Sequence, residues 1–200
     1  MTRILGFDPG LSCMGFGVLD VDNDTGQIDL QHFGFFEIKR NGKAFNDYLN
    51  DAIAGLTENF PRLIQAYDPN VVCAEIVPVG RLGSNTELVV AGITTIKVVS
   101  FQFGLHWMDL AANTVKKTVS GNGRATKAQV RKSLFEIFPT LKTKNDALKK
   151  EQKSKGERAS GLPADVYDGI AVAYTAAIKL GGKIETDIEG TESIEAIAED

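Results

Sequence analysis

Residues 3–22, RILGFDPGLSCMGFGVLDVD, place a single acid between two apolar runs. The runs 3–8 and 14–20 have the composition of buried strands, and a Pro-Gly turn signal separates them. A lone carboxylate such as Asp8 at the tip of a buried strand is costly unless another group keeps it charged. We therefore expect the rest of the chain to supply a positive partner for Asp8.

The composition is that of an ordinary globular chain. Of its 200 residues, 43% are apolar and 24% are charged, which is enough for one well-buried core in a single domain. The sequence shows no run of 18 apolar residues and no signal-peptide pattern, so we expect a protein that is neither membrane-spanning nor secreted. Cys13 and Cys73 sit in separate apolar stretches, which favours reduced thiols and a cytoplasmic location.

The net charge of −4 conceals an uneven distribution. Residues 142–158 hold seven Lys/Arg and three acids, whereas residues 183–200 hold seven acids and one lysine. Without the acidic segment the chain carries a net charge of +2. The acidic average therefore does not exclude a phosphate-rich partner, and we expect residues 183–200 to form a disordered tail.

Residues 1–182 are predicted to form one α/β domain. Short turns between the first three apolar runs predict an antiparallel meander, and the lysine-rich segment 142–158, which lacks an apolar period, is interpreted as a loop or a frayed helix. The fold class is a mixed five-stranded sheet, with its first three strands antiparallel, flanked by helices. The predicted strands are 3–8, 14–20, 32–38, 70–76 and 105–110. The predicted helices are 44–66, 85–103, two within 111–138, and a last one that begins at Pro163. The second of the two helices within 111–138 is predicted to be capped near Thr126.

Four carboxylates are predicted to converge at one edge of the sheet. Asp8 and Glu75 each end a buried strand, so they emerge side by side if those strands are neighbours. Asp165 and Asp168 lie three residues apart on the last helix and share one face. Three of the four acids also have a simpler interpretation: Asp165 as a favourable helix N-terminal residue, Asp168 as a solvated acid, and Glu75 as a partner of Arg81.

Clustered carboxylates repel one another and stay ionised together only around cations. Oxygen ligands without a histidine or thiolate cluster favour Mg²⁺, with Mn²⁺ as a substitute. Two such ions about 3.5–4 Å apart form the usual clamp for attack of water on a phosphodiester. We therefore predict two metal ions per site that keep Asp8 charged, with Gly10, Gly15 and Gly17 letting backbone and a bulky substrate approach it.

Basic residues gather around the turn SGNG at 120–123, whose glycines would let backbone amides approach a phosphate. A solvated basic helix face is the alternative interpretation. The predicted phosphate-binding cluster is Lys116, Lys117, Arg124, Lys127, Arg131 and Lys132, and Arg81 is assigned to the same DNA-binding set.

Four segments resemble, in order and spacing, the motif blocks of RuvC-type Holliday-junction resolvases. The resemblance implies an RNase H-like fold, a homodimer, and Mg²⁺-dependent paired nicking of four-way DNA junctions that leaves 5′-phosphate and 3′-hydroxyl ends. It also implies that Asp8, Glu75, Asp165 and Asp168 are metal-binding catalytic acids and that Lys116 and Lys127 lie near the DNA backbone. The four segments are ILGFDPGLSCMGFGVLD at 4–20, VVCAEIV at 71–77, ANTVKKTVSGNGRATKAQV at 112–130 and PADVYDGIAVAYTAAI at 163–178.

The chain departs from this family pattern in three places. Cellular members tend to carry a base-stacking aromatic residue just after the second acid, where this chain has Pro78; we therefore predict weak sequence preference and cutting of other branched DNA as well. They also have little between the third block and the final aspartates, where this chain has residues 142–158. This insertion is interpreted either as a solvated loop or as a source of DNA backbone contacts through Lys149, Lys150, Lys153 and Lys155. With the acidic tail, these departures suggest a divergent phage-encoded member acting in the cytoplasm of a bacterium or an infected host.

Other interpretations stay open from the sequence. FDPG at 7–10 also matches the first phosphate loop of an actin-like ATPase or sugar kinase, although that two-lobed architecture generally needs a longer chain. A non-catalytic junction-binding protein and an RNase H-type enzyme acting on RNA–DNA hybrids are the further rivals. The apolar helix 85–103 is predicted to be the dimer face, with an internal core helix as its alternative.

Overall fold

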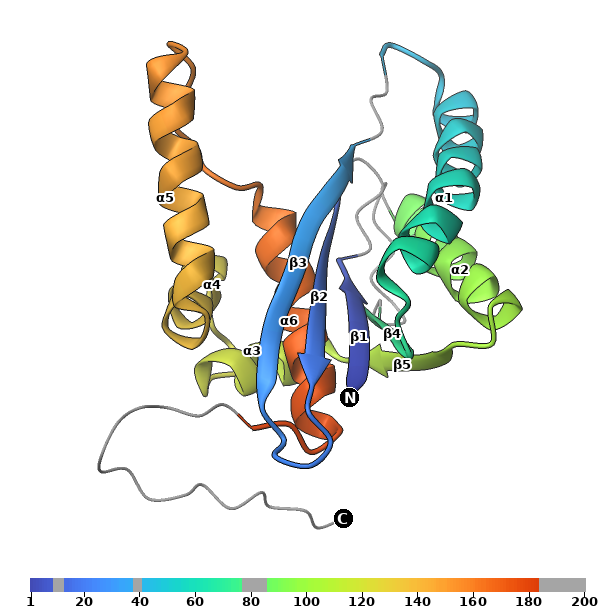
Figure 1. The fold of residues 1–200 in the computed structure, drawn as a ribbon. Helices are drawn as coiled ribbons and strands as arrows, with labels where there is room; N and C mark the ends of the chain where they lie inside the picture. The colour runs from blue at the N-terminus through green and yellow to red at the C-terminus, as the bar shows by residue number, and fades with distance from the viewer. Residues whose placement is uncertain (9–12, 38–40, 77–85, 184–200) are drawn as a thin grey trace.

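The fold is built on the predicted five-stranded mixed sheet, with strand order β3-β2-β1-β4-β5 (Figure 1). The computed structural model describes residues 1–8, 13–37, 41–76 and 86–183. β1 pairs antiparallel with β2 and β2 antiparallel with β3, whereas β1–β4 and β4–β5 are parallel pairs. The strands are β1 (Thr2–Phe7), β2 (Cys13–Val21), β3 (Ile28–Glu37), β4 (Val71–Glu75) and β5 (His106–Leu110).

Helices cover both faces of the sheet because side chains alternate along each buried strand. Ile4 belongs to one buried cluster and its neighbour Leu5 to the other. The cluster with Leu5 packs under α1 (Phe45–Tyr67) and α2 (Thr86–Gln102). The cluster with Ile4 packs under the helices of the second half, which are α3 (Ala112–Ser120), α4 (Lys127–Ile137), α5 (Pro139–Ser154) and α6 (Ala164–Lys179).

Glycines set the distance between α6 and the sheet. A Cβ atom at Gly15 would lie 1.8 Å from the carbonyl oxygen of Asp165, and one at Gly17 would lie 2.7 Å from the Cα atom of Ile170. Gly169 makes the reciprocal approach, since its Cβ would lie 2.6 Å from the carbonyl oxygen of Gly15. The predicted approach of backbone at these glycines is confirmed, whereas the predicted room for a substrate is not found at Gly15 and Gly17, because α6 fills the space that they leave. Gly10 lies outside the described residues.

The lysine-rich segment is helical over most of its length, so the loop interpretation is wrong and the helical alternative is the one that the structure shows. α5 begins with Pro139 at its N-terminus and runs to Ser154. Its inward positions are Leu141, which is fully buried, and Asn145, which is 2% exposed. Because the second inward position is polar, the apolar period of the helix is not visible in the sequence.

The third strand begins earlier than predicted, at Ile28 rather than residue 32. The ladder between β2 and β3 shifts register between Val18 and Leu19, which interrupts the alternation expected of a regular strand. The capping of α4 is as predicted: Thr126 and Gln129 form a reciprocal capping box. In the part of the chain that the structure describes, no helix is both long and apolar enough to cross a membrane.

Candidate active site

Three of the four predicted acids meet at the carboxyl end of β1. Asp8 follows the last residue of β1, and its backbone N–H donates to the Gly15 carbonyl oxygen at 3.0 Å. Asp165 and Asp168 project from the first turns of α6. One carboxylate oxygen of Asp8, one of Asp165 and one of Asp168 all lie within 4.8 Å of one another. The close contact of α6 with Gly15 brings the helix acids to the strand acid.

Glu75 lies at the same edge but outside this tight group. The parallel register pairs Phe7 with Ala74, so Asp8 and Glu75 are level on neighbouring strands. Burial, and then the charge of Asp168, raises the pKa of Glu75, whereas the charge of Lys116 acts against that rise. The structure therefore places Glu75 within the electrostatic reach of the site, at its rim.

The carboxylates of Asp8, Asp165 and Asp168 repel one another when no cation lies between them. Burial, followed by the charges of Asp168 and Asp165, raises the pKa of Asp8 to about 8. These carboxylates offer only hard oxygen donors, which suit a divalent cation such as Mg²⁺ or Mn²⁺. The residues present therefore fit the metal centre that the sequence predicts.

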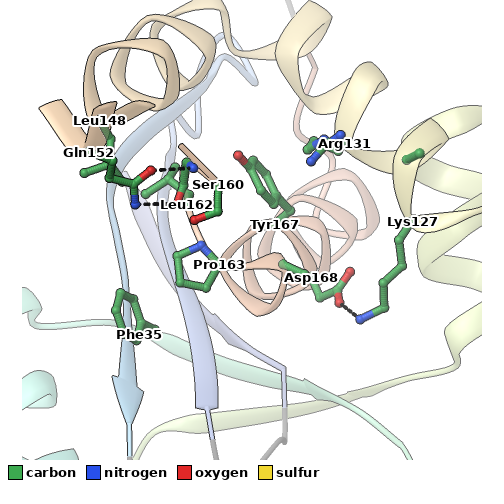
Figure 2. Close-up of a pocket in the computed structure, with 13 residues that line it drawn as sticks. Phe35, Lys127, Arg131, Leu148, Gln152, Ser160, Leu162, Pro163, Tyr167 and Asp168 are labelled. Atoms are coloured by element: carbon green, nitrogen blue, oxygen red, sulfur yellow. Dashed lines mark hydrogen bonds and ion pairs between the residues drawn. The ribbon is translucent and has the colours of Figure 1, made fainter. Parts of the chain in front are cut away.

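Lys127 supplies one positive charge to this group. It is the first residue of α4, and its Nζ donates to Asp168 Oδ2 at 2.5 Å (Figure 2). Burial acts to lower the pKa of Lys127, but its hydrogen bond to Asp168 and the charges of Asp168, Asp8 and Asp165 outweigh this effect and raise the pKa. Lys127 is therefore held as a cation at the mouth of the acidic cluster.

The other predicted basic residues are spread around the site. Lys116 is half-buried on α3, while Lys117 on that helix and Arg124 beyond it are exposed. The Arg131 guanidinium lies 5.8 Å from the Tyr167 ring centre, and Lys132 forms an ion pair with Glu136 at 3.7 Å. Arg81, predicted to bind DNA, lies outside the described residues. Pro78, from which weak sequence preference is predicted, lies outside them as well.

A cavity of about 620 Å³ adjoins the acids and was not predicted. Asp168 and Lys127 line it together with residues of β3, α5 and the segment before α6 (Figure 2). Asn145 of α5 bonds to two residues that line the cavity. Its Oδ1 accepts hydrogen bonds from the Leu162 backbone N–H at 3.1 Å and from the Tyr167 hydroxyl at 2.9 Å. No sequence signal marks Asn145, because a lone asparagine in a lysine-rich segment normally indicates a solvated position.

A mixed sheet with three antiparallel strands followed by two parallel ones, carrying an acidic cluster at the end of its central strand, is the arrangement expected of a metal-dependent nuclease of the RNase H-like fold. Residues 4–150 match the model of the family described as crossover junction endodeoxyribonuclease RuvC. The chain belongs to this family, and the predicted enzyme class is confirmed. The phosphate-loop alternative, an actin-like ATPase or sugar kinase, is thereby set aside.

Individual relatives agree with this assignment. The RuvC of Erythrobacter litoralis is 29% identical over 177 residues, covering 88% of this chain and 93% of its own. The RuvC of Paracidovorax citrulli is 33% identical over 138 residues, covering 68% of this chain and 72% of its own.

Solved structures confirm the fold. Thermus thermophilus RuvC superposes with a TM-score of 0.66 at 18% identity, covering 90% of this chain and 97% of its own. The structure of T. thermophilus RuvC in complex with a Holliday junction substrate gives a TM-score of 0.65 at 16% identity, and it also covers 90% of this chain and 97% of its own. Fowlpox virus resolvase, solved with substrate Holliday junction DNA, gives a TM-score of 0.55 at 16% identity and covers 90% of this chain and 99% of its own.

Proposed function

We propose that this protein binds four-way DNA junctions and hydrolyses one phosphodiester in each of two strands, leaving 5′-phosphate and 3′-hydroxyl ends. The observation that carries the proposal is the meeting of Asp8, Asp165 and Asp168 within 4.8 Å at the carboxyl end of β1. Membership of the RuvC family supports the choice of substrate. Other branched DNA would also be cut, with weak sequence preference.

Asp8, Glu75, Asp165 and Asp168 would hold two Mg²⁺ ions, with Mn²⁺ able to replace them. When bound, such ions make water a stronger nucleophile and stabilise negative charge on the reacting phosphate. The close packing of α6 on Gly15 supports this assignment, because it fixes the helix acids against the strand that carries Asp8. Preorganised ligands of this kind need little rearrangement before they bind.

The basic residues would position the DNA backbone. Lys127 Nζ lies beside Asp168 and can donate to a non-bridging oxygen of the scissile phosphate. Lys116, whose charge acts on Glu75, would contact the same strand from α3. Lys117, Arg124 and Arg131 are exposed and would bind flanking phosphates, which position DNA without reading its sequence.

A homodimer would place one site on each of the two equivalent strands of a junction. The face of α2 supports this arrangement, because it exposes apolar side chains: Val90 is 47%, Val98 50% and Phe101 58% exposed. A hollow of about 680 Å³ between α1 and α2 runs along the same face. Exposed apolar patches of this kind are typical of protein interfaces.

Cleavage of a defined substrate set tests the proposed function. Four-way junctions, forks and linear duplex, each with one labelled strand in turn, would be incubated with the wild-type protein in Mg²⁺ and in Mn²⁺. We expect symmetric nicks in opposite strands of the junction, slower cutting of forks and no cutting of duplex. Binding without cleavage in either metal would identify a non-catalytic junction-binding protein instead, and preferential cutting of RNA–DNA hybrids would identify an RNase H.

A further inference from the structure

An exposed aromatic ring shares the cavity with Asp168, one of the proposed catalytic acids. Phe35 on β3 is 45% exposed and lines the cavity that Asp168 and Lys127 also line. The ladder pairs Phe35 with Gly15, the residue that contacts Asp165, so the ring lies on the α6 face of the sheet. Figure 2 shows Phe35 beside Pro163 on one side of the cavity and the Asp168–Lys127 pair on the other.

The cavity combines features that suit one nucleotide. Its volume of about 620 Å³ falls in the range of sites that hold one small ligand, about 300–1,000 Å³, and is too small for a duplex. Apolar surface comes from Phe35, Leu162 and Tyr167, while Arg131 supplies a positive charge one helical turn beyond Lys127. An aromatic platform next to basic side chains is the arrangement that binds unpaired nucleotides.

Hydrogen bonds tie the cavity wall to α5, which favours a preorganised binding site. Gln152 of α5 accepts a hydrogen bond from the Gly161 backbone N–H at 2.9 Å, and Asn145 holds the next residue, Leu162. Gly161 has a φ of +75°, and a Cβ atom there would lie 2.1 Å from Asn145 Oδ1. The segment before α6 is thus fastened to α5, so the cavity and the acids on α6 keep a fixed relationship.

We infer that this cavity binds one unpaired nucleotide of the strand being cut, next to the scissile phosphate, with its base stacked on Phe35 and its phosphate at Arg131. The inference rests on the proposed function, because the scissile phosphate is placed by the acids and Lys127. Stacking tolerates every base, so this contact is compatible with weak sequence preference.

Removing the ring and removing the base test the same contact from its two sides. Junctions would carry a tetrahydrofuran abasic residue at the nucleotide on either side of the mapped cut, and binding by Asp8→Asn protein would be measured by fluorescence anisotropy. For protein with Phe35 intact, we expect one of the two abasic positions to weaken binding about tenfold. Phe35→Ala should weaken binding of the intact junction to the same extent and show no further loss with the abasic junction. Phe35→Trp should behave as the parent protein.

His32→Ala is the matched control, because His32 is an exposed ring on the same strand that packs against Tyr67 on the other face of the sheet. It should retain the tenfold effect of the abasic residue. Independent, additive losses from Phe35→Ala and the abasic residue would overturn the inference, as would a Phe35→Ala protein that binds like its parent. If wild-type protein neither binds nor cuts four-way junctions, the proposed function itself fails; if it does both and Phe35→Ala has no effect, only the nucleotide site fails.

Discussion

Gly15 lies so close to Asp165 that a methyl group on Gly15 would overlap the carbonyl group of the aspartate. The same glycine accepts a hydrogen bond from the Asp8 backbone N–H. One residue without a side chain thus contacts both the strand acid and the helix that carries the other acids. The geometry of the acidic cluster depends on this contact more than on direct interactions between the carboxylates, which repel one another.

Gly15→Ala should therefore lower both stability and activity. The added methyl meets backbone atoms that cannot rotate away, so α6 must move, and we expect a loss of about 3 kcal/mol in the free energy of unfolding. Urea unfolding and cleavage rates measure the two effects. The control is Gly34→Ala on β3, where the added Cβ meets the outer end of the Phe16 ring and should cost only about 1 kcal/mol. Equal losses at both positions would contradict the role given to Gly15.

The sequence predicted much of this site because its parts lie within regular elements. Asp8 and Glu75 end buried strands, and Asp165 and Asp168 have helical spacing, so their convergence follows from which strands are neighbours. The cavity could not be predicted in the same way. It depends on Phe35 lying opposite Gly15 and on α5, whose inward face carries Asn145 where a periodic helix would carry an apolar residue. Tertiary hydrogen bonds of this kind leave no periodic signal.

Asn145→Ala tests whether that residue fastens α5 to the segment before α6. The substitution leaves the Leu162 N–H and the Tyr167 hydroxyl without their acceptor, and we expect a loss of about 2–4 kcal/mol in the free energy of unfolding. Hydrogen exchange should show reduced protection throughout α5. Lys150→Ala, at an exposed position of the same helix, should leave both measurements unchanged. An Asn145→Ala protein as stable as wild type would refute the anchoring role.

The lysines of α5 should contribute to the salt dependence of junction binding. Leu148 and Gln152 line the cavity that contains Asp168, so Lys149, Lys150 and Lys153 lie on the helix that borders the bound strand. Replacing all three with Gln should reduce the slope of log K against log salt concentration by about two to three, since each phosphate contact contributes about 0.9. Lys179→Gln, in the last turn of α6, is the control and should alter it little. An unchanged slope in the triple variant would exclude α5 from DNA contact.

Val98→Asp should separate the proposed dimer. Val98 is half exposed on α2, so the change should leave the subunit folded while placing a charge in the apolar interface. Light scattering after gel filtration should give about twice 21.6 kDa for wild type and the single mass for the variant. Thr140→Asp, an exposed change on α5, should remain dimeric. A monomeric wild-type protein with full junction-cutting activity would contradict the dimer proposal.

The most direct test of the acidic cluster is strand-resolved cleavage of a four-way junction by the Asp8→Asn protein. This nearly isosteric change removes the charge that β1 contributes to the group of Asp8, Asp165 and Asp168. The control is Asp24→Asn, which alters an exposed acid in the turn between β2 and β3. We expect paired nicks in Mg²⁺ by wild-type and control proteins, and junction binding with a loss of cleavage of at least about 10³-fold for Asp8→Asn. Cleavage by Asp8→Asn at the wild-type rate would contradict the assignment of this cluster as the catalytic metal centre.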